Sequence, residues 1–211
     1  MSLIMSFCTS HGIVMGADRC ITTNLASGES FISTMHERKL FMTSNGFGIA
    51  YAGSSTFKDR PASYWIERFI PKLSVRSRSV SDLVYRLCLA FHRLDPDKSI
   101  IIIGSGYKDG NPQVFSCNSS KLKSCDHLNG KNDCIAFAGE VNLARCIIDA
   151  VPIARNTYTT LDAVDFIKHV ILTTSNIQKF GQIPITVSPE CDLLYIGEKI
   201  SKWIEPPEFL V

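Results

Sequence analysis

The strongest constraint on the fold is the order in which strand-like and helix-like segments follow one another. Short apolar runs broken by turn residues open the chain, two helical patterns follow, and strands and then helices recur before a last pair of strands. Strands and helices do not alternate singly, as they would in a doubly wound parallel sheet. We therefore predict an α+β fold in which antiparallel sheets pack on each other and helices cover their outer faces.

Two hairpins are predicted in the first half of the chain. Each consists of two apolar runs of strand length joined by a short turn that contains glycine, His11-Gly12 in the first and Asn45-Gly46 in the second. The four strands are expected at residues 3–8, 13–17, 39–42 and 47–52.

Helical and extended patterns follow in blocks along the rest of the chain. Serines suited to helix capping, Ser54 or Ser55 and then Ser81, introduce two segments with apolar residues at helical spacing. The apolar run 99–103 and the strand at 114–115 form a third predicted hairpin. Beyond it we expect a strand at 134–137, helices at 140–151 and 161–175, and strands at 184–187 and 193–196.

Length and composition indicate one domain that spans residues 1–211. A chain of 211 residues that is 45% apolar can bury one substantial core. The formal charge is +2, from 22 basic and 20 acidic residues. So balanced a charge gives no support for nucleic acid or an anionic membrane surface as a partner.

Cysteine and histidine spacing argues against metal and redox sites. The eight cysteines lack the short paired spacing of zinc and thiol-redox sites, and the histidines share no metal-ligand spacing. We find no signal-peptide pattern and no apolar run of membrane-spanning length. We therefore expect a cytoplasmic protein with reduced thiols, no metal, no cofactor and no membrane partner.

Ser2 is the first residue that suggests chemistry. It directly follows the initiator methionine, and its small side chain is of the type that permits methionine removal, which would leave a free α-amine beside a hydroxyl. The pKa of an α-amine is about 7.7 to 8.0, so a neutral fraction exists near physiological pH and can accept the proton of the attacking Oγ. One residue then supplies both nucleophile and base. A small second residue is common in proteins, so Ser2 alone decides nothing.

Asp18 and Lys39 each stand at the boundary of a predicted strand. Taken separately, an acid after the run 13–17 and a lysine before Leu40 are ordinary strand-end residues. If Lys39 instead points inward beside Ser2, its charge would lower the pKa of the amine and of the hydroxyl, and Asp18 would hold the ammonium in place. An acid, a lysine and a terminal hydroxyl then form a coherent catalytic set.

Gly53 is a candidate for the remaining requirement, the stabilisation of an oxyanion. A strand over residues 49–52 runs into this glycine before a predicted helix, and a glycine there presents an unobstructed backbone N–H. Such a donor can hold the negative oxygen of a tetrahedral intermediate, and losing one typically costs about 3 kcal/mol. The simpler interpretation of Gly53 is a turn glycine.

In combination these positions resemble the proteasome-type β subunits and their bacterial relatives, the HslV peptidase and the Anbu proteins. In that family a mature N-terminal Thr or Ser begins the first strand, a motif ending in Asp closes the first hairpin, a lysine follows, and a strand ending in Ala-Gly introduces a helix. The matching segments are 11–18, Lys39 and 49–54, and Ile32-Ser33-Thr34 is similar to Anbu-like members. The resemblance is closest over the first quarter of the chain.

The resemblance implies an N-terminal-nucleophile (Ntn) hydrolase fold, a four-layer αββα sandwich of two antiparallel sheets covered by helices. It also implies the roles of the four catalytic candidates. Ser2 would be the nucleophile, Asp18 and Lys39 the acid and the lysine beside it, and Gly53 the oxyanion donor.

The chain departs from the family pattern around this set. The family usually has a serine in its later glycine turn, where this chain has Ala138. An Asp-x-x-Ser pair is usual at the end of the later helix, where this chain has the segment 174–178. Such supporting residues hold a terminal amine in its productive orientation, so the departures bear on activity more than on fold. The candidate supporting residues are Gly139, Ser175 and Asn176.

Two further departures concern the start of the chain. Arg19 directly follows Asp18, whereas the family motif reads Asp-Ser-Arg, so Arg19 is not expected in the usual arginine place. The string Met1-Ser2-Leu3 has the form of a cloning remnant, which leaves the native residue at position 2 open.

The function implied by the resemblance is hydrolysis of amide bonds, with peptides as substrates. Family members assemble into rings, so a homo-oligomer is expected, whereas ring size and an ATPase partner are not determined by the sequence. Two alternatives stay open: a small-amide acylase or amidase on the same fold, and a proteasome-like scaffold that has lost activity.

Overall fold

The computed structural model describes residues 2–24, 30–131, 133–151, 157–181 and 183–205. Within these residues the chain forms two five-stranded sheets, two short hairpins and four α-helices. Every strand pairing among them is antiparallel. The fold is α+β, as the order of segments predicts.

The first sheet holds the N-terminal hairpin near its centre. Its strand order is β12-β1-β2-β13-β14. Every residue of β1 and β2 is buried, which fits their apolar composition and their position between other strands. The strands are β1 (Leu3–Thr9), β2 (Gly12–Asp18), β12 (Cys134–Gly139), β13 (Cys191–Ile196) and β14 (Ser201–Glu205).

The second sheet is built from the middle of the chain. Its strand order is β11-β10-β9-β6-β5, so the hairpin of β5 and β6 lies at one edge and joins the hairpin of β9 and β10 through β6. The strands are β5 (Leu40–Met42), β6 (Gly48–Gly53), β9 (Ile100–Lys108), β10 (Asn111–Asn118) and β11 (Lys123–Asp126).

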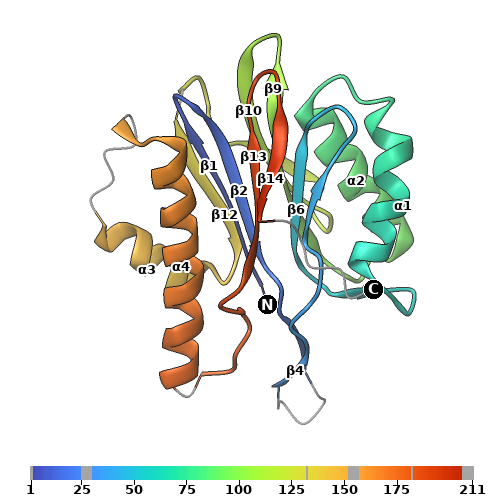
Figure 1. Cartoon of the computed structure of the whole chain (residues 1–211). Coiled ribbons are helices and arrows are strands. Elements are labelled where there is room, and N and C mark those ends of the chain that lie inside the picture. The colour runs from blue at the N-terminus through green and yellow to red at the C-terminus, as the bar shows by residue number, and fades with distance from the viewer. Residues whose placement is uncertain (1, 25–29, 132, 152–156, 182, 206–211) are drawn as a thin grey trace.

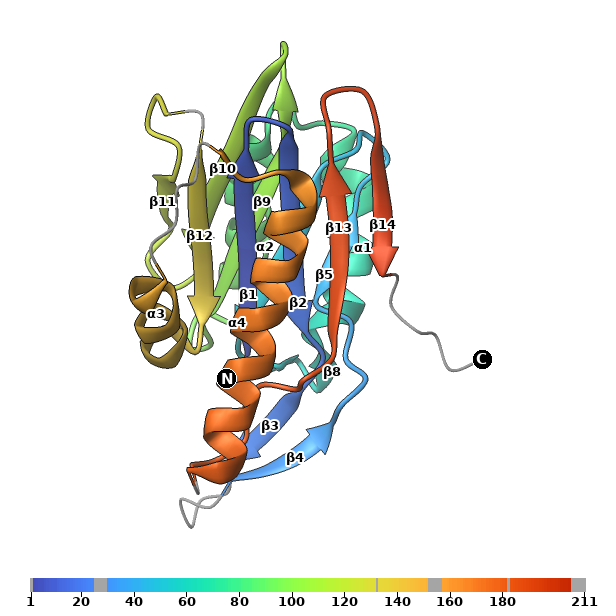
Figure 2. The ribbon, with the colours of Figure 1, turned by 60° about the vertical axis from the view of Figure 1, so that its left-hand side comes forward.

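One pair of helices packs against each sheet. Helices α1 (Ala62–Ser74) and α2 (Val80–Leu94) share a buried apolar cluster with β6 and β9 of the second sheet. Helices α3 (Val141–Ala150) and α4 (Thr160–Phe180) share another cluster with β1 and β2 of the first sheet. Figures 1 and 2 show the two helical pairs on opposite sides of the strands.

A third apolar cluster contains residues of both sheets. Ile4 and Met15 of the first sheet meet Ile103 of the second, and the hydroxyls of the buried residues Ser6 and Ser105 form a hydrogen bond of 2.8 Å between β1 and β9. Because successive side chains of a strand point to opposite faces, the even-numbered residues of β1 face the other sheet and the odd-numbered ones face the helices.

Two short hairpins extend from the ends of the sheets. One consists of β3 (Ile21–Asn24) and β4 (Ser30–Thr34), and it follows β2 directly. The other consists of β7 (Thr56–Phe57) and β8 (Arg60–Pro61), and it leads into α1. The sequence patterns predicted neither hairpin.

The first helix begins later than predicted, because the second short hairpin occupies the place expected for its first turns. Ser54 and Ser55 do not cap it, since α1 follows Pro61. Trp65 of α1 reaches back to donate a hydrogen bond of 2.8 Å to the Phe57 carbonyl, which ties the hairpin to the helix.

The second helix is capped by Ser79 and not by Ser81. The hydroxyl of Ser79 accepts a hydrogen bond of 3.2 Å from the backbone N–H of Asp82. This is the usual N-cap geometry, in which a serine side chain satisfies a free donor of the first helical turn.

The strand predicted at 184–187 is absent from the described structure. The side chain of Gln178 accepts hydrogen bonds from the backbone N–H groups of Thr186 and Val187, at 2.9 and 3.1 Å. These are donors that a strand would use for pairing, so a helix side chain takes the place of a neighbouring strand.

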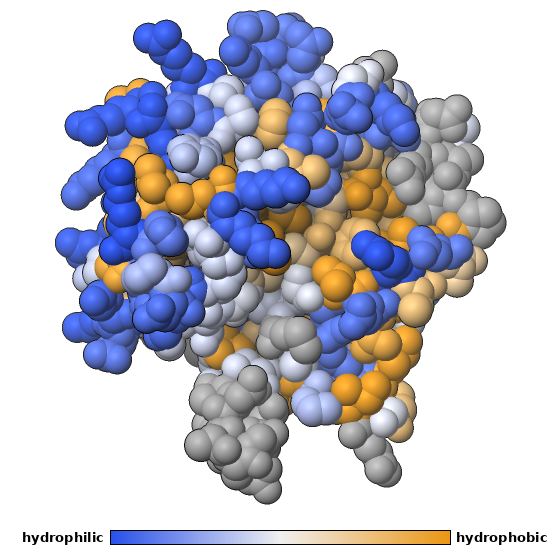
Figure 3. All heavy atoms as spheres, turned by 180° about the vertical axis from the view of Figure 1, so that it is seen from behind, coloured by the Kyte–Doolittle hydropathy of each residue, from blue (hydrophilic) through white to orange (hydrophobic). Residues whose placement is uncertain are grey.

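Polar and apolar residues are unevenly distributed over the face of the molecule that is seen from behind in Figure 3. Seen from behind, hydrophilic residues dominate the side that carries α1 and α2, whereas hydrophobic residues gather toward the side of α3 and α4 (Figure 3). Leu161, Leu172 and Phe180 of α4 are exposed apolar side chains. None of the helices in the described part of the chain combines the length and the apolar composition needed to span a bilayer.

Candidate active site

Asp18 is a fully buried carboxylate at the end of β2, where four donors converge on it. Its Oδ1 accepts hydrogen bonds from the Leu3 N–H at 2.8 Å and from the Lys39 ammonium at 2.9 Å. Its Oδ2 accepts from the backbone N–H groups of Cys20 and Ser188, at 2.8 and 3.2 Å. A buried carboxylate is tolerated when its oxygens are paired in this way.

Lys39 lies immediately before β5 and is buried to the same degree as Asp18. Besides the ion pair with Asp18, its Nζ donates a hydrogen bond to the carbonyl oxygen of Cys20. Asp18 and Cys20 flank a single residue, so both acceptors come from one short segment. The alternative of a solvated lysine at a strand end is therefore wrong, because Lys39 points inward to Asp18 and to the Cys20 carbonyl.

Ser2 precedes β1 and continues its pairing with β12. It is buried, and its carbonyl oxygen accepts a hydrogen bond of 2.7 Å from the N–H of Glu140. Strand alternation places its side chain on the same face as Ile4, toward the second sheet. The next residue, Leu3, donates to the same Asp18 oxygen that binds Lys39, so the backbone that follows Ser2 and the Lys39 ammonium meet at one carboxylate oxygen.

Position 139 requires a glycine, because its backbone lies directly against the backbone of Ser2. The φ of Gly139 is +102°, and a Cβ at this position would lie 1.6 Å from the carbonyl oxygen of Ser2. The neighbouring Ala138 is buried in the cluster that contains residues of both sheets. The contact with Ser2 is therefore made by the backbone of residues 139 and 140.

Gly53 ends β6 with a φ of +119°, and a Cβ there would lie 2.6 Å from the carbonyl oxygen of Ser99. The Tyr51 N–H bonds to the carbonyl of Lys39 at 3.2 Å, on the side of β5. Because N–H directions alternate along a strand, the N–H of Gly53 points to that same side, two residues further on. Gly53 thus presents a donor at the end of the sheet where Lys39 lies.

The two supporting candidates on α4 have different surroundings. Ser175 is buried and Asn176 is exposed. Neither takes part in the hydrogen bonds described around Asp18 and Lys39. Ser188, which follows α4 in the chain, does: its N–H binds Asp18, and its hydroxyl accepts from the Arg19 N–H at 2.8 Å.

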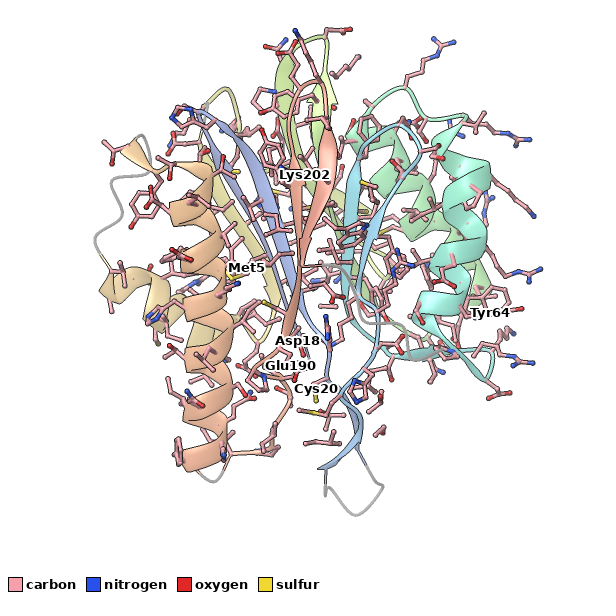
Figure 4. The ribbon with its side chains drawn as sticks, in the orientation of Figure 1. Met5, Asp18, Cys20, Tyr64, Glu190 and Lys202 are labelled. Atoms are coloured by element: carbon pink, nitrogen blue, oxygen red, sulfur yellow. The ribbon has the colours of Figure 1, made fainter. Side chains whose placement is uncertain are left out.

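The sequence patterns missed Ser188 and a buried ion pair beside it. The Nε of Arg19 lies 2.7 Å from Oδ1 of Asp192, in β13. Figure 4 shows Asp18, Cys20 and Glu190 together at the lower ends of these strands. A weak signal existed, because Ser188 and Asp192 lie between the predicted strands at 184–187 and 193–196. Only the pairing of β13 with β2 shows that the start of β13 adjoins Asp18.

Burial raises the pKa of two side chains at this site. Burial raises the pKa of the Cys20 thiol, more than the nearby Lys39 ammonium lowers it, so a neutral thiol is favoured. Burial also raises the pKa of the Asp192 carboxyl, although Arg19 pulls it the other way. Within the described residues no group of three or more His, Cys, Asp or Glu side chains could hold a metal ion.

Two hollows of the surface lie at the other end of the sheets. They measure about 420 and 490 Å³ and share Tyr107, Glu198 and Lys199 in their linings. Neither is lined by Ser2, Asp18 or Lys39. The hydrogen-bonded group at the end of β2 therefore identifies the candidate site, and the hollows do not.

Comparison with solved structures shows that 276 solved chains match this one in fold. They include Anbu from Hyphomicrobium sp. strain MC1, with a TM-score of 0.67 and 15% identity over 96% of this chain and 87% of that one. The Gly-1 mutant of the same protein matches with a TM-score of 0.66 and 16% identity, over 97% and 87%. No family model and no curated protein sequence matches the chain. At this identity the likeness concerns the fold.

Proposed function

We propose that this chain is an N-terminal-nucleophile amide hydrolase of the proteasome-like type, in which Ser2 becomes the nucleophile once Met1 is removed. The proposal includes a single domain over residues 1–211 and the four-layer αββα sandwich of that class. One observation carries the proposal: a single oxygen of Asp18 accepts hydrogen bonds both from the N–H of Leu3, the residue after Ser2, and from the Lys39 ammonium.

The proposed reaction uses the amine and the hydroxyl of Ser2 together. The neutral α-amine takes the proton from Oγ, and Oγ forms a bond to the carbonyl carbon of the substrate. The charge of Lys39 favours the ionised oxygen, and the Gly53 N–H binds the oxyanion of the tetrahedral intermediate. The protonated amine then gives its proton to the leaving nitrogen as the C–N bond breaks. Water attacks the acyl-enzyme by the same route and restores Ser2.

Peptides are the proposed substrates and a homo-oligomer is the proposed assembly, both by the resemblance to proteasome-type subunits. The cytoplasm is the proposed location. Gly139 belongs to the proposed site as a support for the main chain of Ser2, because its backbone lies against the Ser2 carbonyl.

A proteasome-like scaffold without activity is the second candidate, and one observation favours it. Asn176 is exposed and Ser175 is not among the described donors to Asp18, so the usual support on the later helix is not reproduced there. Ser188 offers hydrogen bonds from a different segment, which is why we favour the enzyme.

The test is covalent capture of Ser2 in the full chain. Intact mass and N-terminal sequencing first establish that Met1 is removed. A peptide epoxyketone, which must react with both the hydroxyl and the α-amine of one terminal residue, should then add once per chain at residue 2. Ser2→Ala should abolish the adduct, whereas Ser10→Ala, an exposed serine at the far end of β1, should not.

Three outcomes distinguish the candidates. Retention of Met1, or equal labelling of the Ser2→Ala variant, would refute the enzyme. A fully processed chain that stays unlabelled at high reagent concentration would establish the scaffold. Turnover of small acyl amides without cleavage of peptides or casein would replace the peptidase by an acylase.

A further inference from the structure

Arg19 and Asp192 form a buried ion pair next to the candidate site. Their side chains are 10% and 0% exposed, and Nε lies 2.7 Å from Oδ1. The guanidinium also lies 3.6 Å from a carboxylate oxygen of Glu190, at the surface. Burial of two charges carries a desolvation cost, and apolar replacement of such a pair is often neutral or stabilising. Stability alone therefore gives no reason for this pair.

The backbone of Arg19 is held from two sides as well. Its N–H donates to the hydroxyl of Ser188 at 2.8 Å, and its carbonyl accepts from the N–H of Glu37 at 3.0 Å. Glu37 lies two residues before Lys39, so Arg19 connects the end of β2 to the segment that carries the lysine.

The residues on either side of Arg19 supply both acceptors of the Lys39 ammonium. Asp18 provides its carboxylate and Cys20 its carbonyl oxygen. A rotation of this three-residue segment would move both acceptors at once. Whatever fixes residues 18–20 therefore also controls the position of Lys39. Such control matters for catalysis, because displacement of a catalytic group by about 1 Å can greatly reduce a reaction rate.

We infer that the Arg19–Asp192 ion pair is a positioning device, which fixes residues 18–20 and thereby holds the Lys39 ammonium beside Ser2. Its catalytic meaning rests on the proposed function. Its effect on the position of Lys39 does not, and the two can be measured separately.

Two variants remove the pair in different ways. Asp192→Asn keeps the shape of the side chain and removes its charge. The double variant Arg19→Met with Asp192→Leu replaces both charges by apolar side chains. The matched control is Arg86→Met with Asp82→Leu on α2, where the same two atoms also lie 2.7 Å apart but the side chains are 43% and 32% exposed.

The first readout is the accessibility of Lys39. The folded proteins are treated briefly with acetic anhydride, and acetylation of each lysine is measured by mass spectrometry. In the wild type Lys39 should be protected, since it is 1% exposed. Both variants of the buried pair should acetylate Lys39 faster, on the order of tenfold, as expected when a supporting partner is lost. The control should not change it, and equal protection in all proteins would overturn the inference.

The second readout is the rate of epoxyketone addition to Ser2. A positioning role predicts a maximal rate lower by about 10–100-fold, with little change in half-saturating concentration. It also predicts a lower maximal labelling rate in the double variant even when the melting temperature of that variant is no lower than that of the wild type. A loss that only follows the unfolded fraction would overturn the inference in favour of a structural role.

The failures of the two proposals are distinguishable. Absence of labelling in the wild type refutes the proposed function, while acetylation of Lys39 still decides whether the pair positions it. Normal labelling of Ser2 in every variant refutes the positioning role and leaves the hydrolase intact.

Discussion

At the scale of single residues, the candidate site is organised around the hydrogen bonds that the Asp18 carboxylate accepts. Asp18 receives four hydrogen bonds, and three of them come from backbone N–H groups of residues 3, 20 and 188. Backbone donors do not rotate away as side chains do, so the carboxylate is held firmly before Lys39 binds it. Among the described residues, Lys39 is the charged group that donates to this carboxylate, and the backbone donors fix the place of the acid.

Gly139 gives a direct test of how closely Ser2 is confined. Gly139→Ala places a Cβ 1.6 Å from the Ser2 carbonyl oxygen at a φ of +102°, so the main chain of Ser2 must move. We expect a loss of about 1–3 kcal/mol in the free energy of unfolding from backbone strain, and more from the clash. Urea denaturation measures it, and labelling of Ser2 should slow in parallel.

Gly130→Ala is the matched control for that substitution. Gly130 also has a positive φ, +81°, but a Cβ there meets nothing within 4 Å. The difference between the two variants isolates the contact with Ser2. Equal destabilisation would show that Gly139 matters for its dihedral angles alone.

At the scale of elements, the sequence predicts what local patterns determine. The strands that carry Ser2, Asp18, Lys39 and Gly53 end at glycine turns or at abrupt changes in polarity, so each residue could be placed at a strand boundary. Arg19 could not be assigned its partners in this way, because Ser188 and Asp192 lie 169 and 173 residues further along the chain. Their meeting depends on β13 pairing with β2, which no turn signal encodes.

At this scale, the side chain of Gln178 connects α4 to the segment that directly precedes Ser188. Gln178→Ala would leave the buried N–H groups of Thr186 and Val187 without their acceptor, at a cost of about 1–3 kcal/mol each. Hydrogen exchange should accelerate across residues 183–192 and at the Arg19 amide, whose acceptor is the hydroxyl of Ser188. We expect little change in β9 and β10.

Gln113→Ala serves as the comparison for this prediction. Gln113 also accepts a backbone hydrogen bond, from Val80 at 3.2 Å, but it lies on the second sheet. Its removal should affect exchange at the start of α2 and leave 183–192 unchanged. A segment that stays protected in Gln178→Ala would show that the sheet, and not the helix side chain, holds Ser188 in place.

At the scale of the whole molecule, the buried pair affects how stability depends on pH. Burial raises the pKa of Asp192 in the folded state, against the attraction of Arg19 and Arg38, while Asp18 nearby raises it further. In the unfolded chain the same carboxyl has a pKa of about 3.9. Between these values the folded state binds more protons at this position than the unfolded state, so its contribution to stability rises as the pH falls.

Asp192→Asn removes this titration and leaves the other carboxyls in place. The free energy of unfolding of the wild type, minus that of the variant, should therefore increase as the pH falls from neutrality. It should level off below about 3.9, where the carboxyl is protonated in both states. Denaturation curves at several pH values give the difference directly. A difference that shrinks on acidification would mean that Arg19 stabilises the charged carboxylate by more than burial costs it, and the pair would then contribute to stability in its own right.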